Sequence, residues 1–435
     1  MASGRVQLEA IGAQDSFLTG SPQITYFQKV YKRHTKFAIE LLDNNFDDND
    51  IRYGGTARCT ISRKGDLIRN VYLRIELPSI SSTSGQNIGY TESVGHALIE
   101  HADLIIGGQT IQRITGEYME IYNELFTSDS QQNALKFMVG KTQNGRTGLG
   151  PALGTAAIDS VIGAYPRVFF IPLTFYFMND DSLDIPLSSL LRQEVEVEVK
   201  FRSLEEIVVA GSDSDPTDFE TILANTSRRV NATMPVEYVF LQGQELNYMK
   251  NVDYLITQLQ LSRGVVEGGS NTQSFRLDFV NPVKELFIVV QNQDVVETNL
   301  YTGNDWFNYD SGDTQLSNNV ANHQLSSMEL RFNNEIAVDS QVADTLFLFN
   351  IQPMTRHTRT PNKRKFYTYS FAIDPENSYP TGQVNMSRIQ NKTMTLNFNP
   401  NPNSRDVRIY ARSYNVLRIK DEIAGLLFTE NNTYK

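Results

Sequence analysis

The residues of this sequence that come closest to a known chemical motif are Gly140-Lys141-Thr142, which match the end of a phosphate-binding loop. In such a loop, backbone N–H groups and the lysine hold phosphate oxygens, and another glycine stands five positions before the last one. Position 135 is leucine. Because glycines recur from Gly140 to Gly154, we predict a flexible loop here and no nucleotide site.

Two histidines near a glutamate, His96, Glu100 and His101, offer side chains of the kind that bind zinc. On a strand, residues five apart face opposite sides, and no third ligand follows at a suitable spacing. The glycine and histidine spacing of a cupin enzyme is also missing around them. We therefore predict that these residues hold no metal and that the chain binds no cofactor.

A nucleophile for covalent catalysis is not evident either. The single cysteine, Cys59, lies in the strand-like run from Ala57 to Ile61, so we expect a small strand residue there. A lone cysteine also forbids an intramolecular disulfide, which suggests folding in a reducing compartment. The chain has no G-x-S-x-G motif. We predict no catalytic residue, and hence a protein that is not an enzyme.

The negative net charge argues against a protein that wraps nucleic acid. The chain has 435 residues, with 39 Lys and Arg against 50 Asp and Glu, and its net charge is -11. Basic residues nevertheless cluster twice: Lys29, Lys32, Arg33, His34 and Lys36, and then Arg356, His357, Arg359, Lys363, Arg364 and Lys365. For the first run we weigh contact with a partner or with acidic lipid headgroups against a solvated helix face, and for the second contact with an acidic neighbour.

Two polar loops are further candidates for contacts. The loop 203–231 is rich in acidic residues, but Asp213-Ser-Asp215 lacks the later glutamate of an EF-hand, so we expect a solvated loop. The loop 293–324 contains Trp306, which we predict to be an exposed aromatic that contacts a glycan or receptor. Asn225, Asn231, Asn385, Asn391 and Asn431 each begin an N-x-[ST] sequon. The N-terminal residues lack the apolar core of a signal peptide, so we expect no secretory glycosylation.

Alternating side chains predict strands. In Val195–Phe201 the apolar residues occupy every second position, and the same period is present in 393–398 and 407–411. A strand with one buried face and one solvent-exposed face is typical of an antiparallel sandwich. Helices are predicted only at 22–33, where Ser21 is the N-cap and Pro22 the first helical residue, and at 117–126.

The order of these elements occurs twice in the chain. Four pairs of segments match: 70–77 with 284–290, 103–109 with 329–335, 191–201 with 388–398, and 236–241 with 407–411. The offsets of roughly 170–230 residues are far longer than a solenoid repeat and indicate two domains of one β fold. About eight strands in each domain favour a jelly roll over the shorter immunoglobulin sandwich.

We therefore predict an all-β protein of two tandem eight-stranded jelly rolls, a double jelly-roll, with short helices in the connecting loops. The expected divisions are an N-terminal arm (1–25), a first jelly roll (26–245), a connector (246–262) and a second jelly roll (263–435).

Several segments resemble the major capsid proteins of the nucleocytoplasmic large DNA viruses. GAQDSFLTGSPQITYF from Gly12 to Phe27, continuing to Glu40, resembles the opening of that family. Further matches follow in order at 171–190, 236–245, 281–291, 351–361, 366–389 and 409–419. The resemblance spans residues 12 to 428, with departures at Leu241–Glu245 and at Asn247-Tyr-Met.

The resemblance implies a structural subunit of an icosahedral shell. It implies a homotrimer with a pseudo-hexagonal outline, contacts with neighbouring capsomers and with minor capsid proteins at the inner face, and proximity to an internal viral membrane. It also implies a place in the virion, assembly in the host cytoplasm, and no direct binding of nucleic acid. The alternatives are a minor or vertex capsid protein of the same fold and a carbohydrate-binding jelly-roll lectin.

Overall fold

The computed structural model describes residues 3–48, 50–78, 88–141, 167–210, 226–298, 303–311, 322–361 and 364–428. The chain divides into two units, Met1–Phe37 and Ala38–Lys435. The first unit contains two short helices, α1 (Ser3–Glu9) and α2 (Asp15–Thr19).

The helix predicted at 22–33 is absent, so that prediction was wrong. The apolar side chains that were expected along one side of it, Ile24, Phe27 and Tyr31, are all exposed. A helix this short is marginal in water unless its apolar side packs on another surface. Ser21 also takes a left-handed conformation, with φ 52°, directly before Pro22.

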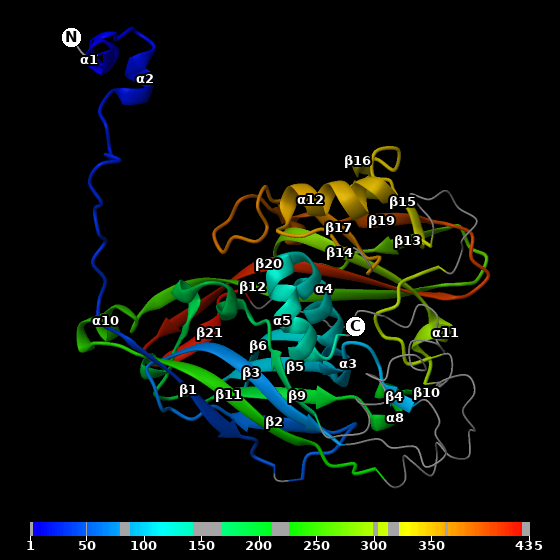
Figure 1. Cartoon of the computed structure of the whole chain (residues 1–435). Helices are drawn as coiled ribbons and strands as arrows, with labels where there is room; N and C mark the ends of the chain where they lie inside the picture. The colour runs from blue at the N-terminus through cyan, green and yellow to red at the C-terminus, as the bar shows by residue number, and fades with distance from the viewer. Residues whose placement is uncertain are drawn as a thin grey trace. The chain divides into compact units, whose positions relative to one another are not determined.

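The first sandwich of the second unit consists of two facing antiparallel sheets (Figure 1). One sheet has the order β1-β11-β3-β7, with β8 pairing with β3, and the other has the order β2-β9-β5-β6. The strands are β1 (Ala38–Asn45), β2 (Thr56–Thr60), β3 (Leu67–Leu77), β5 (Ile99–Ile106), β6 (Gln109–Thr115), β7 (Arg167–Pro172), β8 (Ile185–Pro186), β9 (Val195–Phe201) and β11 (Asn231–Phe240). A separate ladder joins β4 (Ile88–Tyr90) and β10 (Val208–Ala210).

The second sandwich repeats this topology strand for strand. Its sheets have the orders β12-β20-β14-β17 and β13-β19-β15-β16, with β18 pairing with β14 as β8 pairs with β3. The strands are β12 (Val252–Val266), β13 (Thr272–Arg276), β14 (Pro282–Asn292), β15 (Leu325–Phe332), β16 (Glu335–Val338), β17 (Tyr367–Ser370), β18 (Val384–Asn385), β19 (Lys392–Phe398), β20 (Arg405–Lys420) and β21 (Ile423–Leu426), the last of which extends the first sheet. The predicted double jelly roll is confirmed.

The two hairpins that suggested the repeat are also equivalent in detail. Gly107 and Gly108 turn from β5 into β6, and Asn333 and Asn334 turn from β15 into β16, all four with positive φ. Such turns match the twist of the flanking strands and favour Gly and Asn, the residue types that tolerate positive φ. The sequence therefore encodes the same hairpin twice with different residues.

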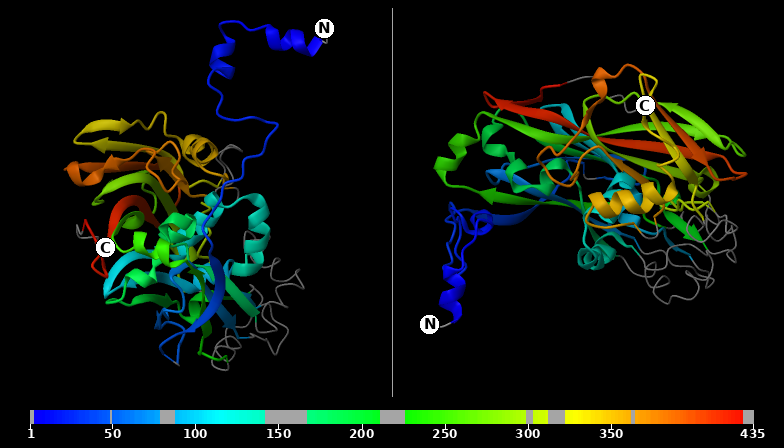
Figure 2. Two further views of the ribbon diagram at one scale, coloured as in Figure 1. Left: turned by 90° about the vertical axis from the view of Figure 1, so that its left-hand side faces the viewer. Right: turned by 90° about the horizontal axis from the view of Figure 1, so that it is seen from above.

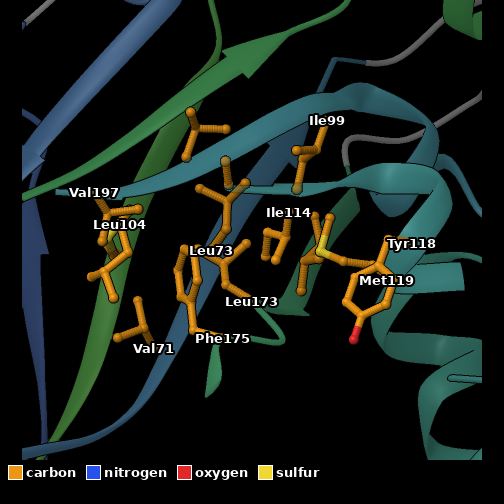
Figure 3. Packing of buried hydrophobic residues seen from close by; sticks show 14 of the residues in the cluster. Val71, Leu73, Ile99, Leu104, Ile114, Tyr118, Met119, Leu173, Phe175 and Val197 are labelled. Carbon is orange, nitrogen blue, oxygen red and sulfur yellow. The ribbon is translucent and has the colours of Figure 1, made fainter. Parts of the chain in front are cut away.

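The cores lie between the facing sheets, as the alternation predicts. Both β9 and β19 alternate strictly between buried and half-buried residues, and Phe201 and Phe398 end the two strands inside the cores. Figure 3 shows the first core, where Val71 and Leu73 of β3 face Leu104 of β5. Apolar side chains from both facing sheets are removed from water in this core, and their burial supplies most of the stability of a sandwich.

Short helices occupy the connections. They are α3 (Val94–Leu98), α4 (Gly116–Phe126), α5 (Asp129–Val139), α8 (Leu204–Ile207), α10 (Gly243–Tyr248), α11 (Gln293–Val296) and α12 (Gln352–Arg356), with one-turn segments η1 (Tyr176–Asn179), η2 (Asp181–Leu183), η3 (Leu187–Ser189), η4 (Phe347–Ile351) and η5 (Met386–Arg388). The predicted helix at 117–126 is confirmed as α4. Most of the segment expected as a connector, 246–262, is strand, because β12 begins at Val252.

The two sandwiches pack directly against each other (Figures 1 and 2). Phe287 and Val289 of β14 and Tyr410 of β20 point away from their own core and join the apolar cluster of the first sandwich. The sheet β12-β20-β14-β17 is thus covered on both faces, which explains why β14 is buried almost throughout.

Candidate functional site

The contact between the sandwiches is built around α4. Thr115 caps its N-terminus by accepting a hydrogen bond from the backbone N–H of Tyr118. Gly116 is required there, because a Cβ would lie 2.1 Å from the carbonyl oxygen of His96. Three buried glutamates, Glu117, Glu120 and Glu124, follow at spacings that place them along one side of the helix.

Each of these glutamates pairs with an arginine from the second sandwich. Arg408 on β20 donates two hydrogen bonds to Glu117, at 2.7 and 2.8 Å. Arg364 donates to Glu120 at 3.1 Å, and Arg359 donates to Glu124 at 3.0 Å. Charge-assisted hydrogen bonds of this kind are among the strongest in proteins. These three glutamate–arginine pairs therefore orient the two sandwiches relative to each other.

Burial and ion pairing shift the pKa values of Glu117 and Glu120 in opposite directions. Burial alone would raise the pKa of Glu117, but Arg408 and the hydroxyls of Tyr410 and Tyr309 hold it below its ordinary value. Burial likewise opposes the charge of Glu120, yet Lys141 and Arg364 keep its pKa well below the usual range. Both groups are charged at neutral pH, and removal of a partner would leave a buried charge uncompensated.

A second charged group extends the contact beyond the end of α4. Glu285 on β14 accepts from Arg412 on β20, and its other oxygen lies 3.4 Å from His357 Nε2. The ring of Phe126, the last residue of α4, packs 4.7 Å from the Arg412 guanidinium and 5.3 Å from the His357 ring. We call α4, the four arginines and these partners the seam.

Two arginines of the second predicted basic run belong to the seam. The acidic neighbour that we expected is the first sandwich of the same chain, reached by Arg359 and Arg364, while Lys365 pairs with Asp310 at 2.9 Å. Lys363 lies outside the described residues. The run is therefore a structural element of the seam and not a free basic surface.

The phosphate-loop candidate also belongs to the seam. Gly140 ends α5 in a left-handed conformation with φ 75°. Lys141 is half-buried and lies between Glu120, at 3.1 Å, and Glu124. Gly140 and Lys141 are thus part of a helix end and not of a flexible loop, and the residues from Thr142 to Gly154 lie outside the described part of the chain.

The two histidines are separated by the fold. His96 lies on α3, not on a strand as expected, and its Nδ1 is 2.7 Å from Glu120 while Asn123 contacts its Nε2. His101 lies on β5, where burial lowers its pKa and nearby Arg113 lowers it further. Among the residues that the structure describes, no group of three or more His, Cys, Asp or Glu is placed to hold a metal ion.

Cys59 is confirmed as a buried strand residue. It lies on β2, and its thiol contacts the carbonyl oxygen of Asn45 at 3.4 Å. Burial raises the pKa of this thiol to about 12. A nucleophilic cysteine needs the opposite shift, so the thiol is inert at neutral pH.

The prediction of an exposed Trp306 was wrong. The ring packs against the core of the first sandwich, its Nε1 donates to the carbonyl oxygen of Glu206 at 2.8 Å, and the Arg202 guanidinium lies 3.8 Å from its centre. Tyr309 in the same loop is buried and donates to Glu117. Polar neighbours in the sequence suggested exposure, but the side-chain amide of Asn304 donates to two backbone carbonyls of the first sandwich.

The loop predicted to be solvated at 203–231 begins instead with α8 and β10, whose Leu204, Ile207 and Val208 are buried, so the prediction was wrong for these residues. The first basic run and the described sequons do lie at the surface. The first basic run is exposed on a non-helical segment, and Lys29 packs 5.4 Å from the ring of Tyr31. Of the sequon asparagines, Asn231, Asn385 and Asn391 are exposed, whereas Asn225 and Asn431 lie outside the described residues, as does Asp213-Ser-Asp215. None of the helices that the structure describes is long and apolar enough to cross a membrane.

Sequence reasoning missed the glutamates of α4. EYMEIYNELF predicts a helix with its charges in water, and nothing local shows that arginines more than 200 residues away will cover them. The one available signal was the spacing of 117, 120 and 124, which places three like charges on one side of a helix, an arrangement that a basic partner stabilises.

Comparison with known proteins agrees with this architecture over nearly the whole chain. Residues 25–242 match the family described as major capsid protein N-terminus, and residues 247–425 match the large eukaryotic DNA virus major capsid protein. The chain is 31% identical to the major capsid protein of Phaeocystis pouchetii virus, over 99% of this chain and 100% of the relative. It is also 31% identical to that of Pyramimonas orientalis virus, with the same shares.

A solved structure has the same fold. A quasi-atomic structure of the PBCV-1 virus capsid superposes with a TM-score of 0.74 at 24% identity, covering 93% of this chain and 100% of the other. Together with the two family matches and the curated relatives, the strand-for-strand duplication shows that the chain is a structural capsid protein and belongs to the family of major capsid proteins of large eukaryotic DNA viruses.

Proposed function

We propose that three copies of this chain form a closed capsomer with a pseudo-hexagonal outline, and that such capsomers tile an icosahedral shell. The observation that carries the proposal is the duplication: two sandwiches with the same strand order in one chain give six similar units in a trimer. A closed ring of six similar units can pack hexagonally, and its neighbours in the shell are other capsomers.

The mass of the full chain in solution tests this proposal. We expect a particle of three times 49.2 kDa by light scattering, and a six-lobed outline of that particle by electron microscopy. A chain that stays monomeric at every concentration, and that is missing from the purified shell, would contradict the proposal.

We also propose the division into an arm (1–25), a first jelly roll (26–245) and a second jelly roll that ends at 435 and begins with β12 at Val252, so that the connector expected at 246–262 shortens to 246–251. The two family matches, which end at residue 242 and begin at 247, support a boundary in this region. Limited proteolysis of the full chain tests the boundary: we expect cleavage between the end of β11 at Phe240 and the start of β12 at Val252, and a first cut inside either jelly roll would contradict it.

We propose that the N-terminal unit, residues 1–37, contacts minor capsid proteins at the inner face of the shell, close to the acidic headgroups of an internal membrane. Large apolar side chains of this unit are exposed, among them Phe27 and Tyr31, and they lie beside the basic residues of the first run. Exposed apolar groups rimmed by charge mark interaction sites, and each Lys or Arg near an anionic membrane adds about 1 kcal/mol.

A full-length variant with Lys29, Lys32, Arg33 and Lys36 changed to Gln tests this contact. We expect the variant to lose co-sedimentation with phosphatidylserine vesicles, whereas Lys250→Gln, on another part of the surface, does not. Equal binding by all three proteins would contradict the membrane contact and leave minor capsid proteins as the partner.

The proposed setting is assembly in the host cytoplasm without direct contact with the genome and without an enzymatic step. The net charge of -11 supports the absence of genome contact, since phosphate neutralisation requires a basic surface. Retention of the recombinant chain on a DNA column at physiological salt would contradict it.

A further inference from the structure

His323 is a buried histidine of the second sandwich that lies outside the seam. It stands directly before β15, and its Nδ1 is 3.2 Å from the hydroxyl oxygen of Tyr367 on β17. The ring of Phe349, in η4, packs edge-on against the imidazole, with 4.7 Å between the ring centres. Because burial disfavours a charged imidazole, a proton added here has to displace these neighbours.

The hydrogen bonds of Tyr367 fix the protonation state of this histidine. The hydroxyl oxygen accepts from the backbone N–H of Leu325 at 3.1 Å and from that of Gln324. Both lone pairs of the oxygen are then in use, so the hydroxyl proton is left to donate to His323 Nδ1. Nδ1 must therefore carry a lone pair, and the imidazole is neutral.

The charged groups that face the imidazole also oppose a second proton. Burial lowers the pKa of His323, and the positive charge of Lys365, just before β17, lowers it further, to about 4. The carboxylate of Asp310 is held by Lys365 at 2.9 Å. Burial raises the pKa of Tyr367, so this neighbour is uncharged at neutral pH.

The backbone around His323 connects three parts of the second sandwich. The carbonyl oxygen of His323 accepts from the side chain of Asn399, directly after β19, at 2.8 Å. The side-chain amide of Gln324 donates to Asn292, at the end of β14, at 2.8 Å and to the backbone carbonyl of Asp310 at 3.1 Å. A shift of residues 323–325 therefore disturbs β14, β19 and the segment that contains Asp310.

That segment, 303–311, also contacts the first sandwich. Trp306 donates to the carbonyl oxygen of Glu206 at 2.8 Å, and the Tyr309 hydroxyl donates to Glu117 in the seam at 3.1 Å. The hydrogen bonds of Gln324 thus hold a segment whose other contacts lie on the first sandwich. A disturbance at His323 is passed through it to the contact between the sandwiches.

We infer that His323 and Tyr367 form an acid-sensitive latch, in which a proton on Nδ1 releases the segment 303–311 from the first sandwich. An Nδ1–H group can donate to the Tyr367 oxygen only if that oxygen gives up the N–H of Leu325 or Gln324, and this displaces the start of β15. The latch acts within one chain, so it stands whether or not the proposed trimer forms. It makes the subunit closed at neutral pH and open in an acidic compartment.

Protonation linkage sets the size and the sign of the effect. The pKa of His323 is about 4 in the folded chain, against its ordinary value of 6.5, so the opened form binds more protons between these values. Protection of the closed form is complete above pH 6.5 and is lost as the pH falls towards 4, by up to about tenfold per pH unit.

Hydrogen exchange of the full chain tests the latch. Between about pH 7 and about pH 4.5, we expect the protection factors of 303–311 and 323–325 to fall roughly 50-fold in the wild type. In His323→Asn the side-chain oxygen accepts from the Tyr367 hydroxyl and has no proton to gain, so protection should persist. His34→Asn, in the exposed first unit, is the matched control and should respond like the wild type.

Lys365→Gln gives a second measurement that leaves the histidine in place. This variant removes the positive charge that opposes protonation, so the pH at which protection is lost should rise towards 6.5. The latch is overturned if the wild type and His323→Asn lose protection equally. Where His323→Asn does not fold, a transition that Lys365→Gln leaves unshifted overturns it.

Discussion

The interior of each sandwich and the seam between the sandwiches are both buried, yet they are held together differently. The interiors contain alternating aliphatic and aromatic side chains, such as Val197 and Phe201 of β9. The seam contains glutamates and arginines, with Glu117 and Arg408 at its centre. Apolar packing tolerates small shifts, whereas a bidentate ion pair fixes one orientation, so the seam specifies geometry and the interiors supply stability.

The largest effect is expected from a charge in a sandwich interior. Phe201→Asp should destabilise the first sandwich, and Phe398→Asp the second, each by at least about 4 kcal/mol, since a ring is lost and an unpaired carboxylate is buried. Denaturant unfolding followed by circular dichroism measures the change. A variant that unfolds at the wild-type denaturant concentration would show that these side chains do not face the interiors.

A smaller but still large effect is expected from the seam. Glu120→Gln leaves Arg364, Lys141 and His96 without their shared carboxylate and should cost roughly 3–5 kcal/mol. The control is Asp253→Asn, which removes the partner of Arg418 at the surface, where water screens the pair. If both variants unfold alike, the seam does not depend on its ion pairs.

The sequence predicted the interiors far better than the seam, and the physical reason is the range of the interactions. Alternation in β9 and the Gly107-Gly108 turn are local, so the residues that carry the signal are neighbours in the chain. Glu120 and Arg364 are neighbours only in the folded protein. Trp306 failed for the same reason, since its cover comes from Arg202 and Glu206, which precede it by about 100 residues.

Asp184 provides a further test, because it is a buried carboxyl at the contact between the sandwiches, outside the seam, that no arginine holds charged. It lies between η2 and β8, and η2 packs on β12 of the second sandwich. Burial raises its pKa to about 8; Arg69 opposes this shift, and Asp181 adds to it. The folded protein therefore keeps a proton on Asp184 at neutral pH, whereas the unfolded chain releases it near pH 4.

The sign of the pH dependence follows from this difference. Asp184 contributes its full stability below about pH 4, and the contribution is lost as the pH rises towards 8, at no more than about 1.4 kcal/mol per pH unit. Asp184→Asn has no proton to lose, so the stability of the variant relative to the wild type should increase between pH 4 and 8 and then level off. Thermal melts of both proteins across this range measure it. A constant difference would mean that Asp184 is charged in the folded protein, and hence that this part of the contact between the sandwiches, like the seam, keeps its carboxylates ionised.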